Sequence, residues 1–285
     1  MDVKIADLHD EFEPGSMSRR SFLDRLADLA GGTAATLTLL PLMENSSAQA
    51  QIIAETDDRL AIARIEYDAN GTKVAGYLAR LKGGQKRPAV IVIHENRGLT
   101  PHIQDVARRF AAEGFLAFAP DMLSPLGGTP SDQTQATQMI RTLNADETVA
   151  RLAAAVPFLA HHPESTGKVG AVGFCWGGGM ANRLAAAGTS LNASVPYYGA
   201  QLPSAEVPKI TAPLLLHYAS LDQRINAGIA EFEAALKSNK KIYELYMYEG
   251  ANHAFNNDTN PGSYNKAAAA LAWQRTIAFF KKYLA

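Results

Sequence analysis

One stretch decides the fold of this chain: residues 167–187 read GKVGAVGFCWGGGMANRLAAA. A short apolar strand at Val169–Val172 runs into a tight turn, and an alanine-rich helix follows from about Gly178. The turn holds Cys175 with a glycine two residues to either side. A nucleophile on a sharp strand-to-helix turn takes a strained backbone conformation, and these neighbours must lack bulk. The pattern predicts a reactive thiol at a helix N-terminus, where the helix dipole favours a thiolate.

A glycine–x–nucleophile–x–glycine turn of this kind is the nucleophile elbow of α/β-hydrolases, in which serine usually stands where this chain has Cys175. The alternative is a buried, inert thiol, because free cysteines are common in protein cores. Cys175 is the only cysteine of the chain, which excludes an internal disulfide and a cysteine-rich zinc site. The histidines are scattered without a ligand pattern, so we expect no metal site.

Length and composition fit one large domain preceded by a leader. The chain has 285 residues, 47% of them hydrophobic, which is enough to bury a sizeable core. Its formal net charge of −1 argues against a nucleic-acid partner. No apolar run after the leader reaches the length of a membrane span, so we expect no stable membrane insertion once the leader is removed.

Residues 1–50 resemble a twin-arginine export signal. Arg19 and Arg20 precede Phe-Leu, the moderately apolar stretch Leu26–Met43 follows, and Ala48–Ala50 offers a small-x-small cleavage site. We therefore expect an exported or periplasmic protein, and a cytoplasmic one if the leader is not functional. The alternatives are an uncleaved anchor and an amphipathic helix that packs on the domain.

Residues 59–285 alternate between strand and helix patterns, which predicts an α/β domain with a mostly parallel sheet of about eight strands and helices on both faces. An Asn-Gly pair at residues 70–71 predicts a hairpin. The expected strands span residues 60–67, 74–81, 88–94, 115–119, 169–172, 193–197, 214–219 and 242–248. The other expected helices span residues 101–112, 133–143, 145–160, 227–238 and 264–284.

Candidate catalytic side chains follow four of the expected strands: Glu95, Cys175, Asp222 and His253. Ligands of such sheets bind beyond the carboxyl ends of the strands. The order nucleophile, acid, histidine is that of α/β-hydrolases, so His253 is the predicted base and Asp222 the residue that orients it. Taken one at a time, each residue has an alternative role. Asp222 also fits an ordinary turn residue, and His253 also fits a loop histidine that is hydrogen-bonded to the backbone.

The other histidines suit different roles. His94 lies near the site but precedes the nucleophile, and His217, inside an apolar strand, fits a hydrogen-bonded core residue. His161 and His162 end a helix and are expected in solvent, and His102 is expected on a helix surface. Two backbone N–H groups are predicted to form the oxyanion hole, those of Trp176 and Asn96.

The motifs together resemble the dienelactone hydrolase family from about Arg59 to the C-terminus. They are His94–Gly98, Phe118–Asp121, Gly173–Gly178, Asp222 and Asn252–Phe255. The resemblance implies an α/β-hydrolase fold and a Cys-His-Asp triad that hydrolyses lactones and esters without a cofactor. It also implies that Glu95 accepts the hydrogen bond of the resting thiol until substrate displaces it. The alternative for Glu95 is an exposed loop carboxylate.

Two departures from the family concern substrate. In the family, two arginines bind the carboxylate of the substrate. This chain has no arginine at either position: the first falls in Met122–Pro125, and the second is Asn257. We therefore expect a small-molecule ester or lactone that is neutral or differently charged, since an anionic dienelactone would lack its cationic partners. Arg97 is a possible replacement or a surface residue. Trp176 and Tyr198 fit a pocket wall or the core equally well.

Three functions stay open at this point. The first is hydrolysis of carboxylic esters or lactones through an acyl-thioester on Cys175. The second is acyl transfer or thioester cleavage by the same residues. The third is a non-catalytic binding protein of the same fold, which predicts a sluggish, protonated thiol.

Overall fold

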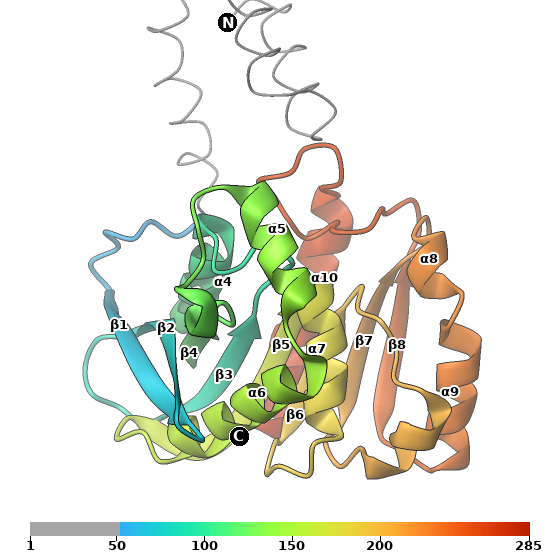
Figure 1. The fold of residues 1–285 in the computed structure, drawn as a ribbon, viewed down its shortest axis with the longest axis horizontal. Helices are drawn as coiled ribbons and strands as arrows, with labels where there is room; N and C mark the ends of the chain where they lie inside the picture. The colour runs from blue at the N-terminus through green and yellow to red at the C-terminus, as the bar shows by residue number, and fades with distance from the viewer. Residues whose placement is uncertain (1–51) are drawn as a thin grey trace, which may run out of the picture.

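The structure is a computed structural model that describes residues 52–285, and the predicted leader and its cleavage site lie outside the described residues. Eight strands form one sheet in the order β1-β2-β4-β3-β5-β6-β7-β8 (Figure 1). The strands are β1 Leu60–Ala69, β2 Thr72–Leu81, β3 Arg87–Ile93, β4 Leu116–Pro120, β5 Ser165–Phe174, β6 Ala193–Tyr197, β7 Leu214–Ala219 and β8 Tyr243–Tyr248. The helices are α4 Pro101–Ala112, α5 Gln133–Thr142, α6 Ala145–Ala160, α7 Trp176–Ala185, α8 Gln223–Asn226, α9 Ile229–Ser238 and α10 Lys266–Tyr283, with short 3₁₀ turns η1 Ser124–Leu126 and η2 Ser204–Lys209.

Antiparallel pairing is confined to the end of the sheet formed by β1, β2 and β4. Strands β1 and β2 form the predicted hairpin, and Asn70 and Gly71 have φ of 55° and 87°, the positive values that a tight two-residue turn needs. Strand β2 then pairs antiparallel with β4, and every pairing from β4 onward is parallel. The fold prediction is confirmed: a mostly parallel eight-stranded sheet flanked by helices.

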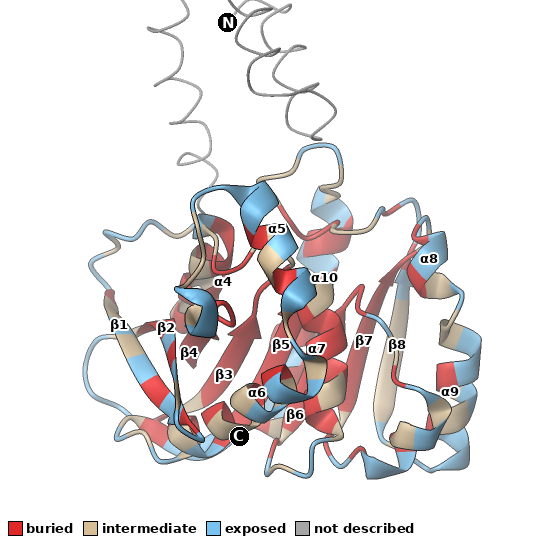
Figure 2. Cartoon of the chain, viewed as in Figure 1, coloured by how far each residue is buried: buried red, intermediate tan, exposed pale blue. Residues whose placement is uncertain are grey.

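Strands that are buried on both faces explain the continuous apolar runs in the sequence. In β3, Val90 and Val92 join a core layer with α4 and α10, whereas Ile91 and Ile93 join a second layer with α6, α7 and α9. Figure 2 shows the central strands buried between these helices. The parallel strands therefore direct their carboxyl ends, and the loops that follow, to one edge of the sheet.

Two helix boundaries differ from the sequence prediction. Helix α7 begins at Trp176, directly after Cys175, and not near Gly178. The helix expected at residues 227–238 is α9, which begins at Ile229, and a short helix that the sequence did not predict, α8, precedes it with Asp222 as its cap. Both differences bring a helix N-terminus next to a predicted catalytic residue.

The described chain is held to α4 from its first residue. Asp105 accepts the backbone N–H groups of Ile52 and Ile53 at 3.0 and 2.9 Å, and Arg108 donates to the Ile53 carbonyl at 2.6 Å. Both charged side chains are about 1% exposed. In the part of the chain that the structure describes, no helix is both long and apolar enough to span a bilayer.

Candidate active site

Cys175 lies at the elbow between β5 and α7 with φ of 56°, a left-handed conformation that is strained for a residue other than glycine. The flanking glycines are required by backbone contacts. A Cβ on Gly177 would come within 2.4 Å of the His94 carbonyl oxygen, and one on Gly173 within 2.0 Å of the Gly177 carbonyl oxygen. These close approaches explain the residue pattern and press the start of α7 against the loop after β3.

The structure brings Cys175, His253 and Asp222 into one chain of contacts. The Nε2 atom of His253 lies 3.0 Å from the Cys175 sulfur, and its Nδ1 atom is hydrogen-bonded to Asp222 Oδ2. The second carboxylate oxygen of Asp222 accepts the N–H of Ile225 at the start of α8, at 3.3 Å. The carboxylate is therefore fixed at both oxygens, and its partner on His253 can only be a protonated Nδ1. Nε2 is then free to accept a proton from the thiol.

The thiol itself is protonated at rest. Burial, and after it the negative charge of Glu95, raise the pKa of Cys175 to about 11, and the Trp176 N–H acts in the opposite direction. The expected thiolate-favouring effect of the helix N-terminus is therefore outweighed. The thiol becomes a nucleophile at neutral pH only if a base takes its proton, and His253 is within reach.

Glu95 lies in the loop after β3, and its carboxylate is held by the loop that carries the histidine. Asn257 Nδ2 donates to Glu95 Oε2 at 2.8 Å, and Asn257 Oδ1 accepts the N–H and hydroxyl of Thr259 at 3.0 and 2.7 Å. The two bonds from Thr259 fix the amide so that its donor faces Glu95. Asn257 was predicted to bind substrate. In the structure its side chain is only 5% exposed, and its amide donor is engaged by Glu95. Within residues 52–285 the thiol contacts His253, and no hydrogen bond joins it to Glu95; the gating role stays a prediction.

The two predicted oxyanion donors lie on segments in direct contact. Asn96 follows Glu95 in the loop after β3, Trp176 opens α7, and Gly177 packs on the backbone of His94 between them. The Trp176 N–H points to the Cys175 sulfur. The Trp176 N–H is therefore close to the sulfur, whereas the N–H of Asn96 stays a predicted oxyanion donor.

Tyr198 and Arg97, the other predicted pocket residues, lie beside the site in different ways. Tyr198 has φ of 39° and is buried, with its ring centroid 5.0 Å from that of His253. Its hydroxyl has no hydrogen-bond partner among the residues the structure describes. Burial raises the pKa of Tyr198 well above its usual value, so it stays neutral. Arg97 is half-buried in the loop after β3.

The remaining histidines lie outside this chain of contacts. His217 is a hydrogen-bonded core residue, as predicted, and contacts Thr276 and Tyr248. The expectation for His102 is wrong: it is 4% exposed, and its Nδ1 lies 3.0 Å from Asp258. Helix α4 directs His102 toward Asp258, in the loop after His253. The sequence of the helix alone does not show that this loop packs there.

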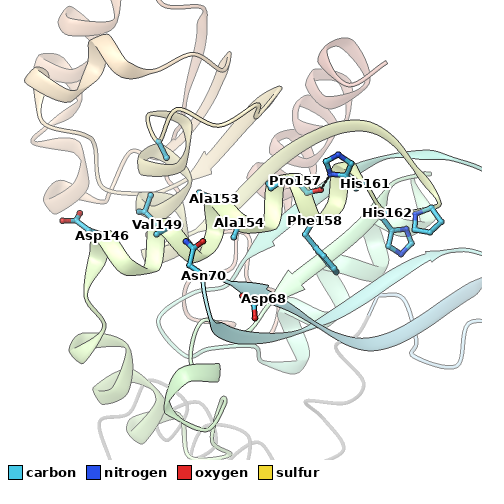
Figure 3. Close-up of a pocket in the computed structure, with 13 residues that line it drawn as sticks. Asp68, Asn70, Asp146, Val149, Ala153, Ala154, Pro157, Phe158, His161 and His162 are labelled. Carbon is cyan, nitrogen blue, oxygen red and sulfur yellow. Dashed lines mark hydrogen bonds between the residues drawn. The ribbon is translucent and has the colours of Figure 1, made fainter.

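A groove of about 940 Å³ lies elsewhere, along α6 beside the β1–β2 turn (Figure 3). Its wall includes Asp68, Phe158, His161 and His162, but none of the predicted catalytic residues. Across residues 52–285, no group of three or more histidine, cysteine or acidic side chains is arranged to hold a metal ion.

A nucleophile elbow at the centre of a mostly parallel sheet defines the α/β-hydrolase fold, and this chain has that fold. The model of the "Dienelactone hydrolase family" matches residues 74–284. The chain belongs to the dienelactone hydrolase family and is a carboxylic ester hydrolase.

Three comparisons illustrate this relationship. "Protein usf" of Aquifex pyrophilus is 35% identical over 228 residues, covering 77% of this chain and 98% of that protein. "Putative carboxymethylenebutenolidase" of Saccharolobus solfataricus is 31% identical over 254 residues, covering 76% and 97%. The crystal structure of "Putative Dienelactone Hydrolase" from Klebsiella pneumoniae has a TM-score of 0.72 at 28% identity, covering 79% of this chain and 99% of that chain.

Proposed function

We propose that this hydrolase cleaves small, neutral carboxylic esters or lactones through an acyl-thioester on Cys175. The observation that carries the proposal is the 3.0 Å contact between Cys175 and His253, whose other ring nitrogen is bonded to Asp222. A thiol with a pKa of about 11 needs such a base to react at neutral pH.

The reaction begins when His253 Nε2 takes the thiol proton and the sulfur attacks the carbonyl carbon. The carbonyl electron pair moves to oxygen, and the N–H groups of Asn96 and Trp176 stabilise the oxyanion. When the intermediate collapses, the His253 proton passes to the leaving alkoxide. Water then gives a proton to His253 and attacks the thioester, the acid departs, and the sulfur takes the proton back. Asp222 stabilises the imidazolium in both steps.

Two features support an uncharged substrate. Asn257 stands at one position where the resemblance implies a substrate-binding arginine, and its amide is committed to Glu95. The other position falls in a segment without a cation, Met122–Pro125. A substrate carboxylate would therefore meet the charge of Glu95 without an arginine at either of these two positions. The name of the Saccharolobus relative supports lactones as one substrate class.

The proposal is tested by hydrolysis of p-nitrophenyl acetate, p-nitrophenyl butyrate, a neutral lactone and dienelactone, with Cys175→Ala as control. We expect turnover of the neutral compounds, little turnover of dienelactone, and none in the variant. Near-wild-type activity of Cys175→Ala would exclude the thiol mechanism. Faster turnover of dienelactone than of the neutral lactone would refute the neutral-substrate proposal.

Residues 1–50 are proposed to export the protein by the twin-arginine route. The support is the Arg19-Arg20 motif, and Ala48–Ala50 as a cleavage site that precedes the anchored Ile52. N-terminal sequencing of protein from the periplasmic fraction tests it. A start near Gln51 is expected, and retention of the whole protein in the cytoplasm would contradict export.

A further inference from the structure

His94 directly follows β3, and both of its ring nitrogens are engaged. Its Nε2 lies 3.1 Å from the backbone N–H of Met122, and its Nδ1 lies 2.6 Å from the carbonyl oxygen of Glu95. A backbone N–H only donates, so Nε2 is the acceptor and the proton lies on Nδ1. Nδ1–H therefore donates to the Glu95 carbonyl. Complete burial lowers the pKa of His94, which keeps this neutral form.

The carbonyl that His94 holds belongs to the Glu95–Asn96 peptide, whose N–H is the predicted oxyanion donor. A trans peptide is planar, so its C=O and N–H point in opposite directions. The same carbonyl also accepts the N–H of Gly98 at 3.4 Å. Once its oxygen is held by these two donors, the direction of the Asn96 N–H is fixed as well.

The ring of His94 also contacts the residue that carries the other predicted donor. It stacks on the Trp176 ring, with centroids 5.3 Å apart and planes inclined by 14°. Trp176 in turn packs against a small apolar cluster from α5 and the loop after β4, which consists of Leu123, Ala136 and Ile140. One buried ring therefore touches both segments from which the oxyanion donors come.

We propose that His94 is a positioning residue of the oxyanion hole, which holds the Glu95–Asn96 peptide so that its N–H faces the developing oxyanion. The inference rests on the proposed acylation of Cys175. His94 moves no proton in this role, because its Nε2 is occupied by Met122 and its Nδ1 proton by Glu95. The His94 ring supplies a hydrogen bond of fixed direction to the Glu95 carbonyl, and the ring itself is fully buried from solvent.

The matched variants are His94→Asn and His94→Leu, which have nearly the same shape. Both lose the ring stacking and the Met122 contact, so any cost of folding is shared. Only asparagine keeps an N–H close to the position of Nδ1, able to donate to the Glu95 carbonyl. The pair therefore differs in the one hydrogen bond that the proposal needs.

Two reactions of Cys175 separate positioning from general damage to the site. Acylation by p-nitrophenyl acetate, followed as the burst of p-nitrophenol, passes through an oxyanion. Alkylation by iodoacetamide is a displacement at a saturated carbon and develops none. Loss of one oxyanion donor slows acyl transfer by about 10²- to 10³-fold. For a donor that is misdirected and not removed, we expect acylation by His94→Leu to fall by roughly 10- to 100-fold.

The proposal further expects alkylation within about twofold of wild type in both variants, and recovery of most of the acylation rate in His94→Asn. Equal losses of acylation and alkylation, or equal acylation rates in the two variants, would overturn it. A wild-type burst without turnover would refute the hydrolase but leave this comparison intact. A wild type that is alkylated and never acylated would overturn both. Melting temperatures of the two variants establish that they are folded to the same degree.

Discussion

His253 and His217 each have both ring nitrogens engaged, but by partners of different charge. His253 lies between a carboxylate and a thiol, Asp222 and Cys175. His217 lies between two neutral hydroxyls, with Thr276 Oγ1 at 3.0 Å and the hydroxyl of Tyr248 at 2.9 Å. Burial, aided by the charge of Arg275, lowers the pKa of His217 to about 3.

The difference lies in the partners and not in the number of hydrogen bonds. A carboxylate at one ring nitrogen and a thiol at the other are the partners that the proposed role of His253 as a base requires. Two hydroxyls in a dry core provide no negative charge, so His217 stays neutral and serves the packing. A histidine with two partners is therefore evidence for catalysis only when one partner is an anion and the other a group that must lose a proton.

The strongest test of this comparison converts the carboxylate beside His253 to an amide. In Asp222→Asn the side-chain oxygen can still accept the N–H of Ile225, but the amide donor then faces His253 Nδ1. The proton moves to Nε2, which can no longer accept one from the thiol. We expect kcat for p-nitrophenyl acetate to fall on the order of 10⁴-fold. A loss below about tenfold at an unchanged melting temperature would contradict the role of Asp222.

A smaller effect is expected when the charge of Glu95 is removed. Glu95→Gln keeps an oxygen for Asn257 but no longer opposes the thiolate, so the pKa of Cys175 falls below about 11. Each unit of that fall increases the thiolate fraction at pH 8 about tenfold, and iodoacetamide alkylation speeds up in proportion. The control is Glu66→Gln on the exposed face of β1, which should leave the rate unchanged. Slower alkylation of Glu95→Gln would show that the carboxylate assists the thiol instead of opposing it.

The smallest effect on catalysis is expected at His217. His217→Gln should change kcat at pH 8 by less than about threefold, because the residue contacts no reacting group. Its effect appears in the pH dependence of stability. The unfolded chain takes up a proton at this histidine below a pH of about 6.5, whereas the folded chain, with a pKa of about 3, does not. Wild type therefore loses unfolding free energy as the pH falls from about 6.5 toward 3, at up to about 1.4 kcal/mol per pH unit.

His217→Gln lacks that contribution, so its melting temperature should fall less between pH 7 and pH 4.5 than that of wild type. Thermal unfolding followed by circular dichroism at the two pH values measures the difference. Parallel declines in the two proteins would mean that His217 is already protonated in the folded state.

The fold was predictable because its signals are local. The hairpin follows from Asn70-Gly71, and the buried strands from apolar runs such as the one that became β3. The boundaries of α7 and α8 were missed because they depend on caps. Cys175 takes a left-handed conformation at the start of α7, and Asp222 serves both as the partner of His253 and as the cap of α8.

The site was predictable only in part, because its remaining features join residues far apart in the chain. The sequence order located Cys175, Asp222 and His253 at strand ends, and the structure places them in contact. The bond between Glu95 and Asn257 crosses 162 positions and has no local signal. The raised pKa of Cys175 results from burial and from Glu95, and neither is visible in an elbow motif that by itself suggested the opposite shift.

The bonds that fix Ile52 to the buried Asp105 use a main-chain N–H, and the side chain of Ile52 is 62% exposed. Every residue except proline offers the same N–H, so this attachment does not depend on which side chain is present. Side chains at and before this joint can therefore change by mutation while the bond to Asp105 is kept, because the bond reads the main chain alone.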